Sequence, residues 1–141
     1  MRALLAGSLA LALVFAGAGC NDDPAEDALG PGTVTVEVEL RHSRFRPARL
    51  QVVEGTTVRF VVRNSDPIDH ELIVGPPDVH RRHERGTEPY HPPKPGEVSV
   101  AAGSTAETTY EFSEPGTVEM ACHLPRHLAY GMRGAIEVVR T

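Results

Sequence analysis

The sequence predicts an all-β domain, a Greek-key sandwich or barrel of about eight short strands. From residue 33 onward, apolar side chains recur with a period of two, which is the period of a half-buried strand. Gly and Pro separate these runs at short intervals, as turns do between strands. A chain of 141 residues is long enough for one such domain with a modest core.

The strands are expected in a regular order along the chain. Residues 33–40, 50–52 and 58–62 alternate apolar with polar side chains, and Glu54-Gly55 marks the turn between the last two runs. Further short strands are expected at 71–74, 98–100, 108–112, 118–122 and 135–139. No stretch repeats apolar residues at i, i+3, i+4 and i+7 over a useful length, so no amphipathic helix is predicted.

The composition excludes several classes of protein. Two Cys residues are too few for a disulfide-dense mini-protein or for a four-thiolate zinc or iron–sulfur site. The net charge of −5 argues against a nucleic-acid partner, because such binding needs Lys and Arg to neutralise phosphates. A 40% share of hydrophobic residues is typical of a folded domain and not of a disordered chain.

Residues 1–20 have the layout of a signal peptide. One positive charge precedes an apolar run at 3–15, which is too short to span a bilayer as a helix. Residues 17–20 resemble a bacterial lipobox, in which the cysteine, here Cys20, takes lipid and becomes the new N-terminus. Cleavage after Ala18 by ordinary signal peptidase is the alternative. We expect an exported protein, lipid-anchored on the outer face of the cytoplasmic membrane or held in the periplasm.

Residues 21–32 are acidic and rich in small residues, Pro and Gly, with too little apolar surface to fold. We interpret them as a flexible tether whose ends lie about 20 Å apart. The tether connects the lipid anchor to the folded domain, which we expect at 33–141.

One short segment near the C-terminus carries three residue types that bind soft metals. Cys122, His127 and Met132 follow a C-x4-H-x4-M spacing between two predicted strands. A thiolate, an imidazole and a thioether together suit copper, which exchanges between the cuprous and cupric states. The trigonal copper–thiolate arrangement also needs a second imidazole. His70 is the best candidate, because it lies just past a predicted strand.

These residues resemble the cupredoxins, or type 1 blue copper proteins, which include plastocyanin, azurin and pseudoazurin. The resemblance extends over nearly all of residues 33–141 and implies a cupredoxin-like fold with one mononuclear type 1 copper. It includes an upstream pattern similar to the second and third strands of the family, Phe45-x-Pro47-x-x-Leu50-x-Val52-x-x-Gly55-x-x-Val58-x-Phe60-x-x-x-Asn64.

The resemblance also implies the ligands and the function. His70 and His127 would bind copper through imidazole nitrogen, Cys122 through its thiolate, and Met132 as a weak axial ligand. The implied function is to carry single electrons between redox partners through Cu(II) and Cu(I), without enzymatic activity. The alternative is a copper-binding or delivery protein with no redox partner. Because Cys20 takes lipid and Cys122 binds copper, we expect no disulfide between them.

Redox partners are expected to dock around His127. Arg126, where relatives often have Gly, adds a positive charge that suits an acidic partner surface. Backbone groups near Asn64 and Glu71 are expected to hydrogen-bond around the metal, and the protein is expected to be a monomer. Four apolar neighbours would surround the imidazole edge, the usual point of electron entry in proteins that this one resembles: Leu124, Pro125, Leu128 and Ala129.

Three other chemistries fit the sequence less well. A multicopper oxidase carries His-Cys-His and His-x-His, but Ala121 precedes Cys122 and the chain contains no His-x-His. A binuclear purple copper site needs two cysteines in one loop, and Cys122 stands alone in its loop. A catalytic Cys–His dyad leaves Met132 and the second histidine unexplained.

Residues 75–96 form an insertion loop that contains six Pro and three histidines, His80, His83 and His91. One interpretation is a rigid, exposed insertion over one end of the sandwich. The other is a second, weaker metal site or a copper-loading loop, which three His within twelve residues would favour. Both interpretations are open at this point.

Overall fold

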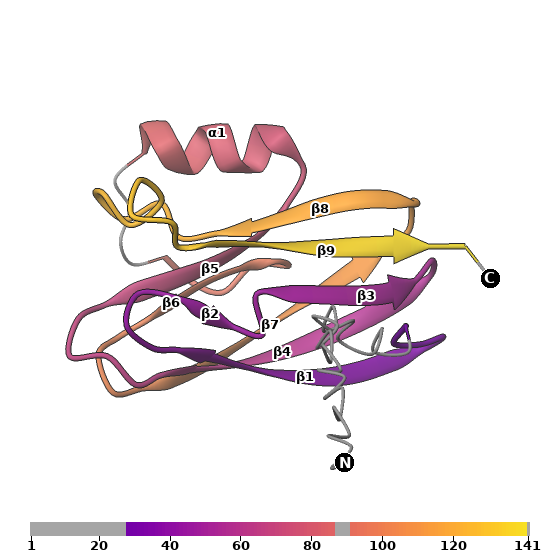
Figure 1. Cartoon of the computed structure of the whole chain (residues 1–141), viewed down its shortest axis with the longest axis horizontal. Coiled ribbons are helices and arrows are strands. Elements are labelled where there is room, and N and C mark those ends of the chain that lie inside the picture. Colours follow the sequence, from indigo (N-terminus) through magenta and orange to yellow (C-terminus); the bar gives the residue numbers. More distant parts are fainter. Residues whose placement is uncertain (1–27, 87–90, 141) are drawn as a thin grey trace, which may run out of the picture.

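The structure is a computed structural model that describes residues 28–86 and 91–140. The predicted all-β sandwich is confirmed, with nine strands in the described residues where about eight were expected (Figure 1). One sheet has the strand order β2-β1-β4-β7 and the other has the order β3-β9-β8-β5-β6. The strands are β1 (Thr33–Leu40), β2 (Phe45–Arg46), β3 (Arg49–Val53), β4 (Thr56–Asn64), β5 (His70–Gly75), β6 (Glu97–Val100), β7 (Thr105–Phe112), β8 (Gly116–Ala121) and β9 (Arg133–Val139).

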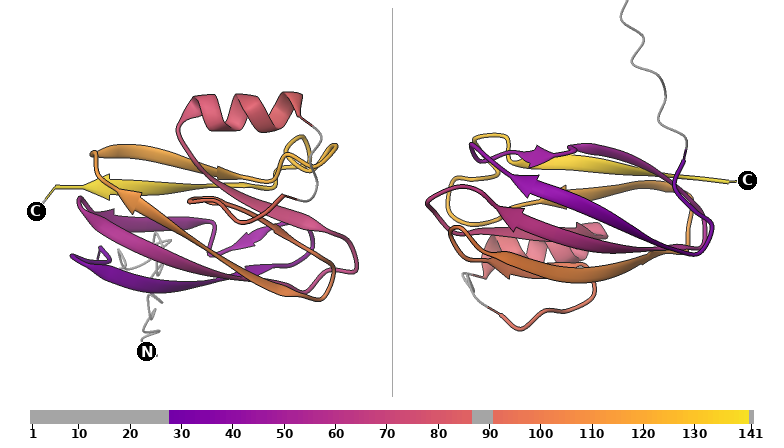
Figure 2. Two further views of the ribbon diagram at one scale, coloured as in Figure 1. Left: turned by 180° about the vertical axis from the view of Figure 1, so that it is seen from behind. Right: turned by 90° about the horizontal axis from the view of Figure 1, so that it is seen from below.

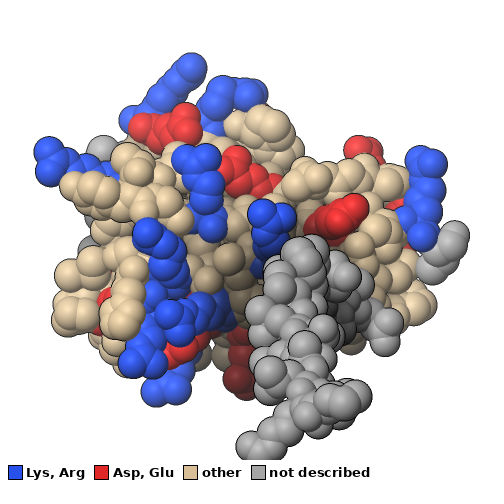
Figure 3. Space-filling model, viewed as in Figure 1, with Lys and Arg blue, Asp and Glu red and all other residues tan. Residues whose placement is uncertain are grey.

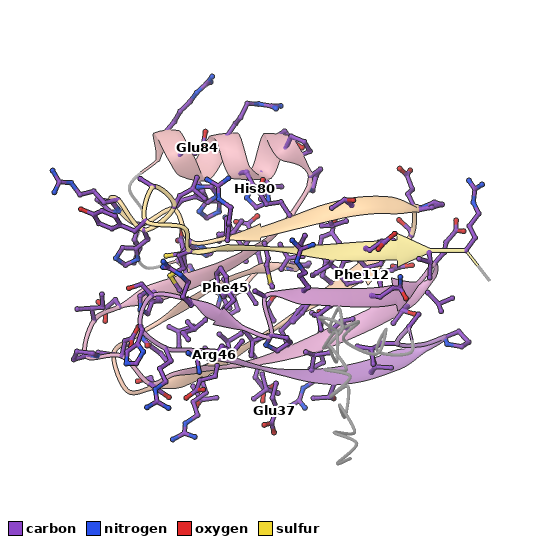
Figure 4. All side chains as sticks on the ribbon, viewed as in Figure 1. Glu37, Phe45, Arg46, His80, Glu84 and Phe112 are labelled. Carbon is purple, nitrogen blue, oxygen red and sulfur yellow. The ribbon has the colours of Figure 1, made fainter. Side chains whose placement is uncertain are left out.

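The hydrophobic core lies between the two sheets. Alternation along β4 buries Val58, Phe60 and Val62 completely. Phe45 and Phe112 lie between the layers and are 2% and 1% exposed (Figure 4). Burying each such side chain stabilises the fold by about 1.5–3 kcal/mol. The core therefore gives the loops at the ends of the sandwich a rigid frame.

Two loops meet at one end of the sandwich. β5 begins at His70, and β8 ends at Ala121. The two strands run antiparallel with Ile73 opposite Ala121, so the start of β5 and the end of β8 lie at the same end of the sheet. The β4–β5 loop and the β8–β9 loop are therefore neighbours, at the left end in Figure 1 and the right end in the left view of Figure 2.

The prediction of residues 75–96 as a loop without a helix is wrong. The segment contains helix α1 (Pro77–Arg85), which lies over the outer face of the second sheet (Figure 1). A proline in the first turn, Asp78 beside it and basic residues in the last turn are typical of helix ends. Hydrophobic periodicity missed the helix because His80 and His83 form much of its inner face. His80 is only 4% exposed, so the interpretation as an exposed insertion fails for this residue.

Residues before β1 also pair with the sandwich. The N–H of Leu29 donates to the carbonyl of Gln51 at 2.9 Å, and its own carbonyl accepts from the N–H of Val53 at 2.8 Å. The end of the segment interpreted as a tether therefore lies along the edge of β3. The predicted signal peptide and Cys20 lie outside the described residues. Within the described part of the chain, no helix has the length and apolar character needed to cross a bilayer.

Candidate metal centre

Three side chains from the two neighbouring loops converge on one point. His70 Nδ1 lies 3.2 Å from His127 Nδ1, and Cys122 Sγ lies 3.2 Å from the same nitrogen. One donor atom of each residue lies within 4.8 Å of the other two. The sequence predicted these three residues as partners, and the structure brings them together.

His70 is oriented by a carboxylate behind its ring. Its Nε2 donates to Asp66 Oδ2 at 2.9 Å, and both side chains are buried. Asp66 also accepts from the backbone N–H groups of His42 and Ser43, at 2.7 and 2.8 Å. Burial alone would raise the pKa of Asp66, but these hydrogen bonds and His70 hold that pKa below its ordinary value. With its proton on Nε2, His70 presents the lone pair of Nδ1 to the other donors.

Cys122 is fully buried just past the end of β8. Burial raises the pKa of its thiol to about 12, although backbone N–H groups of Glu71 and Leu124 hydrogen-bond to the sulfur and oppose the shift. A thiol this weakly acidic becomes a thiolate at neutral pH only when a metal cation takes the place of its proton. The same N–H groups then face a negatively charged sulfur, which they stabilise.

The loop from Cys122 to Met132 is closed by its own backbone. The N–H of Cys122 donates to the carbonyl of Met132 at 3.2 Å, and the N–H of Met132 donates to the carbonyl of His127 at 3.0 Å. A further bond runs from the His127 N–H to the Leu124 carbonyl, also at 3.0 Å. Met132, the predicted axial ligand, is fully buried at the base of this loop. These bonds set the separation of Cys122 and His127.

The donor set suits copper. Donors that each lie about 2.0–2.3 Å from one shared ion stand about 3–4 Å apart, as neighbouring donors do here. Two imidazoles and a thiolate form the trigonal set of blue copper sites. Burial and the charge of His70 lower the pKa of His127, which keeps the ring nitrogen free to bind a metal at neutral pH.

Comparison with known proteins decides the family. Residues 32–139 match the sequence pattern of the family described as "Copper binding proteins, plastocyanin/azurin family". The chain belongs to the plastocyanin/azurin family of copper-binding proteins. Its cofactor is therefore copper, as the sequence predicted.

Two curated proteins are similar to most of this chain. A "Copper-resistant cuproprotein CopI" of Rubrivivax gelatinosus is 36% identical over 118 residues, which cover 82% of this chain and 71% of that protein. A protein with the same name from Pseudomonas aeruginosa is 28% identical over 177 residues, with 97% of each chain covered. Both relatives are thus named for copper.

Two solved auracyanin structures share the fold of this plastocyanin/azurin family member. Auracyanin B superposes with a TM-score of 0.61 and 24% identity, covering 79% of this chain and 91% of that one. Auracyanin A of Chloroflexus aurantiacus superposes with a TM-score of 0.60 and 23% identity, covering 77% and 100%. These matches confirm the cupredoxin-like sandwich.

His127 lies nearer the surface than the other two donors of the copper-binding site. It is half-buried, whereas Pro125 and Ala129 beside it are exposed. Two large apolar side chains of the same end of the sandwich are also exposed, Ile68 by 47% and Tyr130 by 60%. Lys and Arg side chains gather over α1 and over β2, so part of the surface is basic despite the net charge of −5 (Figure 3).

Sequence reasoning missed the role of Asp66, although the residue stands four positions before His70 in the predicted loop. Asn64 was expected to act through its backbone but also acts through its side chain. Its Nδ2 donates to the carbonyl of Ile68 at 2.8 Å, and its Oδ1 accepts from the N–H of Asp66 at 3.0 Å. Glu71 does present its N–H to the sulfur of Cys122, as expected.

Proposed function

We propose that this protein carries single electrons at a type 1 copper bound by His70, Cys122 and His127, with Met132 as the weak axial ligand. The convergence of two imidazoles and one thiol within 4.8 Å carries the proposal. Bound copper supplies the Cu(II)/Cu(I) couple. The proposal involves no enzymatic turnover.

The surrounding residues favour reversible electron exchange, because they hold the donors in place in both copper states. Asp66 fixes the orientation of His70. The backbone bonds of the β8–β9 loop fix Cys122 and His127, and the two N–H groups at the sulfur disperse the charge of the thiolate. A site that rearranges little on reduction passes electrons with a low barrier. The half-buried ring of His127 and its apolar surroundings suit contact with a redox partner.

An optical experiment tests this function. Protein loaded with Cu(II) should show an intense visible charge-transfer band from the copper–thiolate bond, and Cys122→Ser should abolish that band. Met132→Leu is the matched variant: it should keep the band and raise the reduction potential, because losing a donor favours the lower copper charge. A colourless Cu(II) complex of the unmodified protein would defeat the proposal.

The relatives favour a second function, copper binding in resistance without a redox partner. The relatives from Rubrivivax gelatinosus and Pseudomonas aeruginosa are both named copper-resistant cuproproteins. The two functions separate in a strain that lacks the gene and is challenged with copper. If copper binding alone protects the cell, a variant that still binds one copper per chain but has lost its reversible potential should restore growth. If electron transfer is required, only variants that keep the potential should restore it.

We extend the proposal to the location of the protein: export, with lipid on Cys20 as the membrane anchor. The acidic tether then allows the copper domain to reach redox partners along the membrane surface. Labelled palmitate should be incorporated into the unmodified protein and not into Cys20→Ser. Cleavage after Ala18 would instead give an unlabelled protein that is released in soluble form.

A further inference from the structure

A second group of metal-binding side chains lies beneath α1, on the side of the sheet opposite the copper centre. We call it the histidine cluster, and its members are His80, His83, His91, His123, Glu71 and Glu97. The cluster adjoins the copper centre through the chain, because Glu71 follows His70 and His123 follows Cys122. Glu71 and Glu97 are 2% and 6% exposed, so two carboxylates are buried here among histidines.

Three members of the histidine cluster converge on one point. Glu71, His83 and His91 each offer one ligand atom within 4.8 Å of the other two. Glu71 Oε2 lies 3.7 Å from His83 Nδ1, which is too long for a hydrogen bond. The other oxygen, Oε1, accepts from the backbone N–H of His123 at 2.7 Å and fixes the carboxylate. Glu71 therefore turns a free oxygen toward His83.

The hydrogen bonds of the two histidines leave their inward nitrogens available to a metal. His83 Nε2 donates to Glu97 Oε2 at 2.8 Å, which leaves the lone pair on Nδ1 beside Glu71. His91 Nδ1 donates to the carbonyl of Pro92 at 3.0 Å, which leaves the lone pair on Nε2. His91 Nε2 is buried and has no hydrogen-bond partner among residues 28–86 and 91–140. Metal-bound histidines characteristically donate their second N–H to a carboxylate or a backbone carbonyl, as both do here.

We propose that Glu71, His83 and His91 form a second metal site, which binds a divalent cation of the Cu²⁺ or Zn²⁺ class. Two imidazoles and a carboxylate are borderline-to-hard donors with no sulfur among them, which suits Cu²⁺ and Zn²⁺. Of these ions, Cu²⁺ binds such donors more tightly. The site is distinct from the type 1 copper, and its existence does not depend on electron transfer.

An ion can reach the proposed site from solvent. A hollow of about 270 Å³ opens beside His83 and His91 and is also lined by Arg82, Lys94 and Glu97. Arg82 donates to Glu97 Oε1 at 2.6 Å, so its charge is partly compensated. A cation bound between Glu71 and the two histidines would supply the opposite charge for the buried carboxylate of Glu71, as Arg82 does for Glu97.

His80 and His123 support the site without belonging to it. His80 Nδ1 lies 2.9 Å from His123 Nε2, and His80 Nε2 lies 3.2 and 3.3 Å from the carbonyls of Gly75 and Glu119. These bonds attach α1 to β5 and β8. The ring of His123 stacks on that of His83, with centroids 6.0 Å apart, and thereby limits rotation of His83.

Titration of copper-free protein with Cu²⁺ tests the proposal. The first ion should produce the visible thiolate band. The second should produce an electron paramagnetic resonance signal with large parallel hyperfine splitting and no strong visible band. His91→Ala should keep the first ion and its band, and bind the second ion at least tenfold more weakly. This variant should fold, because in the described part of the chain the ring of His91 hydrogen-bonds to the adjacent Pro92 and to no other residue.

A matched control and a second variant make the outcome decisive. Arg81→Ala changes an exposed residue of α1 that belongs to neither group of ligands, and should keep both ions. Glu71→Gln keeps the acceptor for His123 and the backbone N–H at the Cys122 sulfur, and it should weaken binding of the second ion. Zn²⁺ added to protein that holds one Cu²⁺ should bind to the unmodified chain and not to His91→Ala. Uptake of a single ion by the unmodified protein, or equal second-ion affinity in His91→Ala, would overturn the proposal. Either result leaves the thiolate band, and with it the proposed function, untouched.

Discussion

The copper centre and the histidine cluster are built on the same two chain segments but face opposite sides of one sheet. Successive side chains of a strand point to opposite faces. At the start of β5, His70 therefore points to the copper centre and Glu71 points toward α1. Just past β8, Cys122 and His123 divide in the same way. Two adjacent dipeptides thus supply both groups of side chains.

The two regions differ in how their donors are buried. The copper centre is buried by the sandwich itself, whereas the histidine cluster is buried only because α1 covers the outer face of the sheet (Figure 1). Figure 4 shows His80 on the side of α1 that faces the sheet. An outer face without a helix would leave Glu71 in water, where a carboxylate needs no partner. The insertion therefore turns a surface carboxylate into a buried group that must be compensated.

The largest expected effect comes from removing the carboxylate behind the copper centre. Asp66→Ala leaves His70 Nε2 and the backbone N–H groups of His42 and Ser43 without their acceptor. We expect the free energy of unfolding to fall by about 2–4 kcal/mol. Copper affinity should fall about 10–100-fold. Denaturant titration and copper competition measure the two effects.

Asp69→Ala is the control for that substitution, because Asp69 lies in the same loop and accepts one exposed hydrogen bond, from Ala102. It should cost less than about 1 kcal/mol and leave copper affinity unchanged. Equal losses of stability and copper affinity in the two variants would show that these properties depend on the loop in general and not on the Asp66–His70 contact.

The raised pKa of the Cys122 thiol predicts that the copper-free protein loses stability at alkaline pH. The thiol's pKa of about 12 in the folded state exceeds the ordinary value of 9.0. The free energy of unfolding keeps its full value below pH 9 and declines as the pH rises toward 12, because the thiol ionises in the unfolded chain before it ionises in the folded protein. The slope is at most about 1.4 kcal/mol per pH unit. Urea titrations of copper-free protein between pH 8.5 and 10.5 measure it, and Cys122→Ala should show a shallower slope. Parallel slopes would contradict the burial of the thiol.

A substitution at His80 tests whether the copper centre depends on α1, and its expected effect on stability is smaller than that of Asp66→Ala. His80→Ala removes the bonds that attach α1 to the sheet, and we expect the free energy of unfolding to fall by about 1–2 kcal/mol. The visible band of the copper centre should stay in place. His91→Ala, with one bond to its neighbour, should cost less than about 0.5 kcal/mol. A band that shifts in His80→Ala would show that the copper centre depends on the helix.

The copper centre could be predicted from sequence because its donors sit at the ends of regular strands with a recognisable spacing. Cys122, His127 and Met132 fall within one loop, and His70 was the candidate for the second imidazole because it lies just past a predicted strand. The histidine cluster could be suspected but not assembled. The inner face of α1 lacks hydrophobic periodicity, and the register that places Glu71 opposite the helix comes from pairing between distant strands. Asp66 was missed because its acceptor role depends on the β1–β2 turn, far away in sequence.

A modest effect is expected at Arg126, which is beside His127 on the exposed side of the copper centre. Its φ of 73° lies in the left-handed region, which costs a residue with a side chain about 1–2 kcal/mol and a glycine almost nothing. Arg126→Gly should therefore raise the free energy of unfolding by about 0.5–1 kcal/mol, after the greater entropy of glycine in the unfolded chain is subtracted. Arg133→Gly, on β9, removes the same charge from an extended backbone and should lower stability instead. If both variants lose stability, strain at Arg126 is absent. Electron exchange with an acidic partner at low salt should be slower in Arg126→Gly and unchanged in Arg133→Gly. That result would show that the strained Arg126 places a useful positive charge at the docking face.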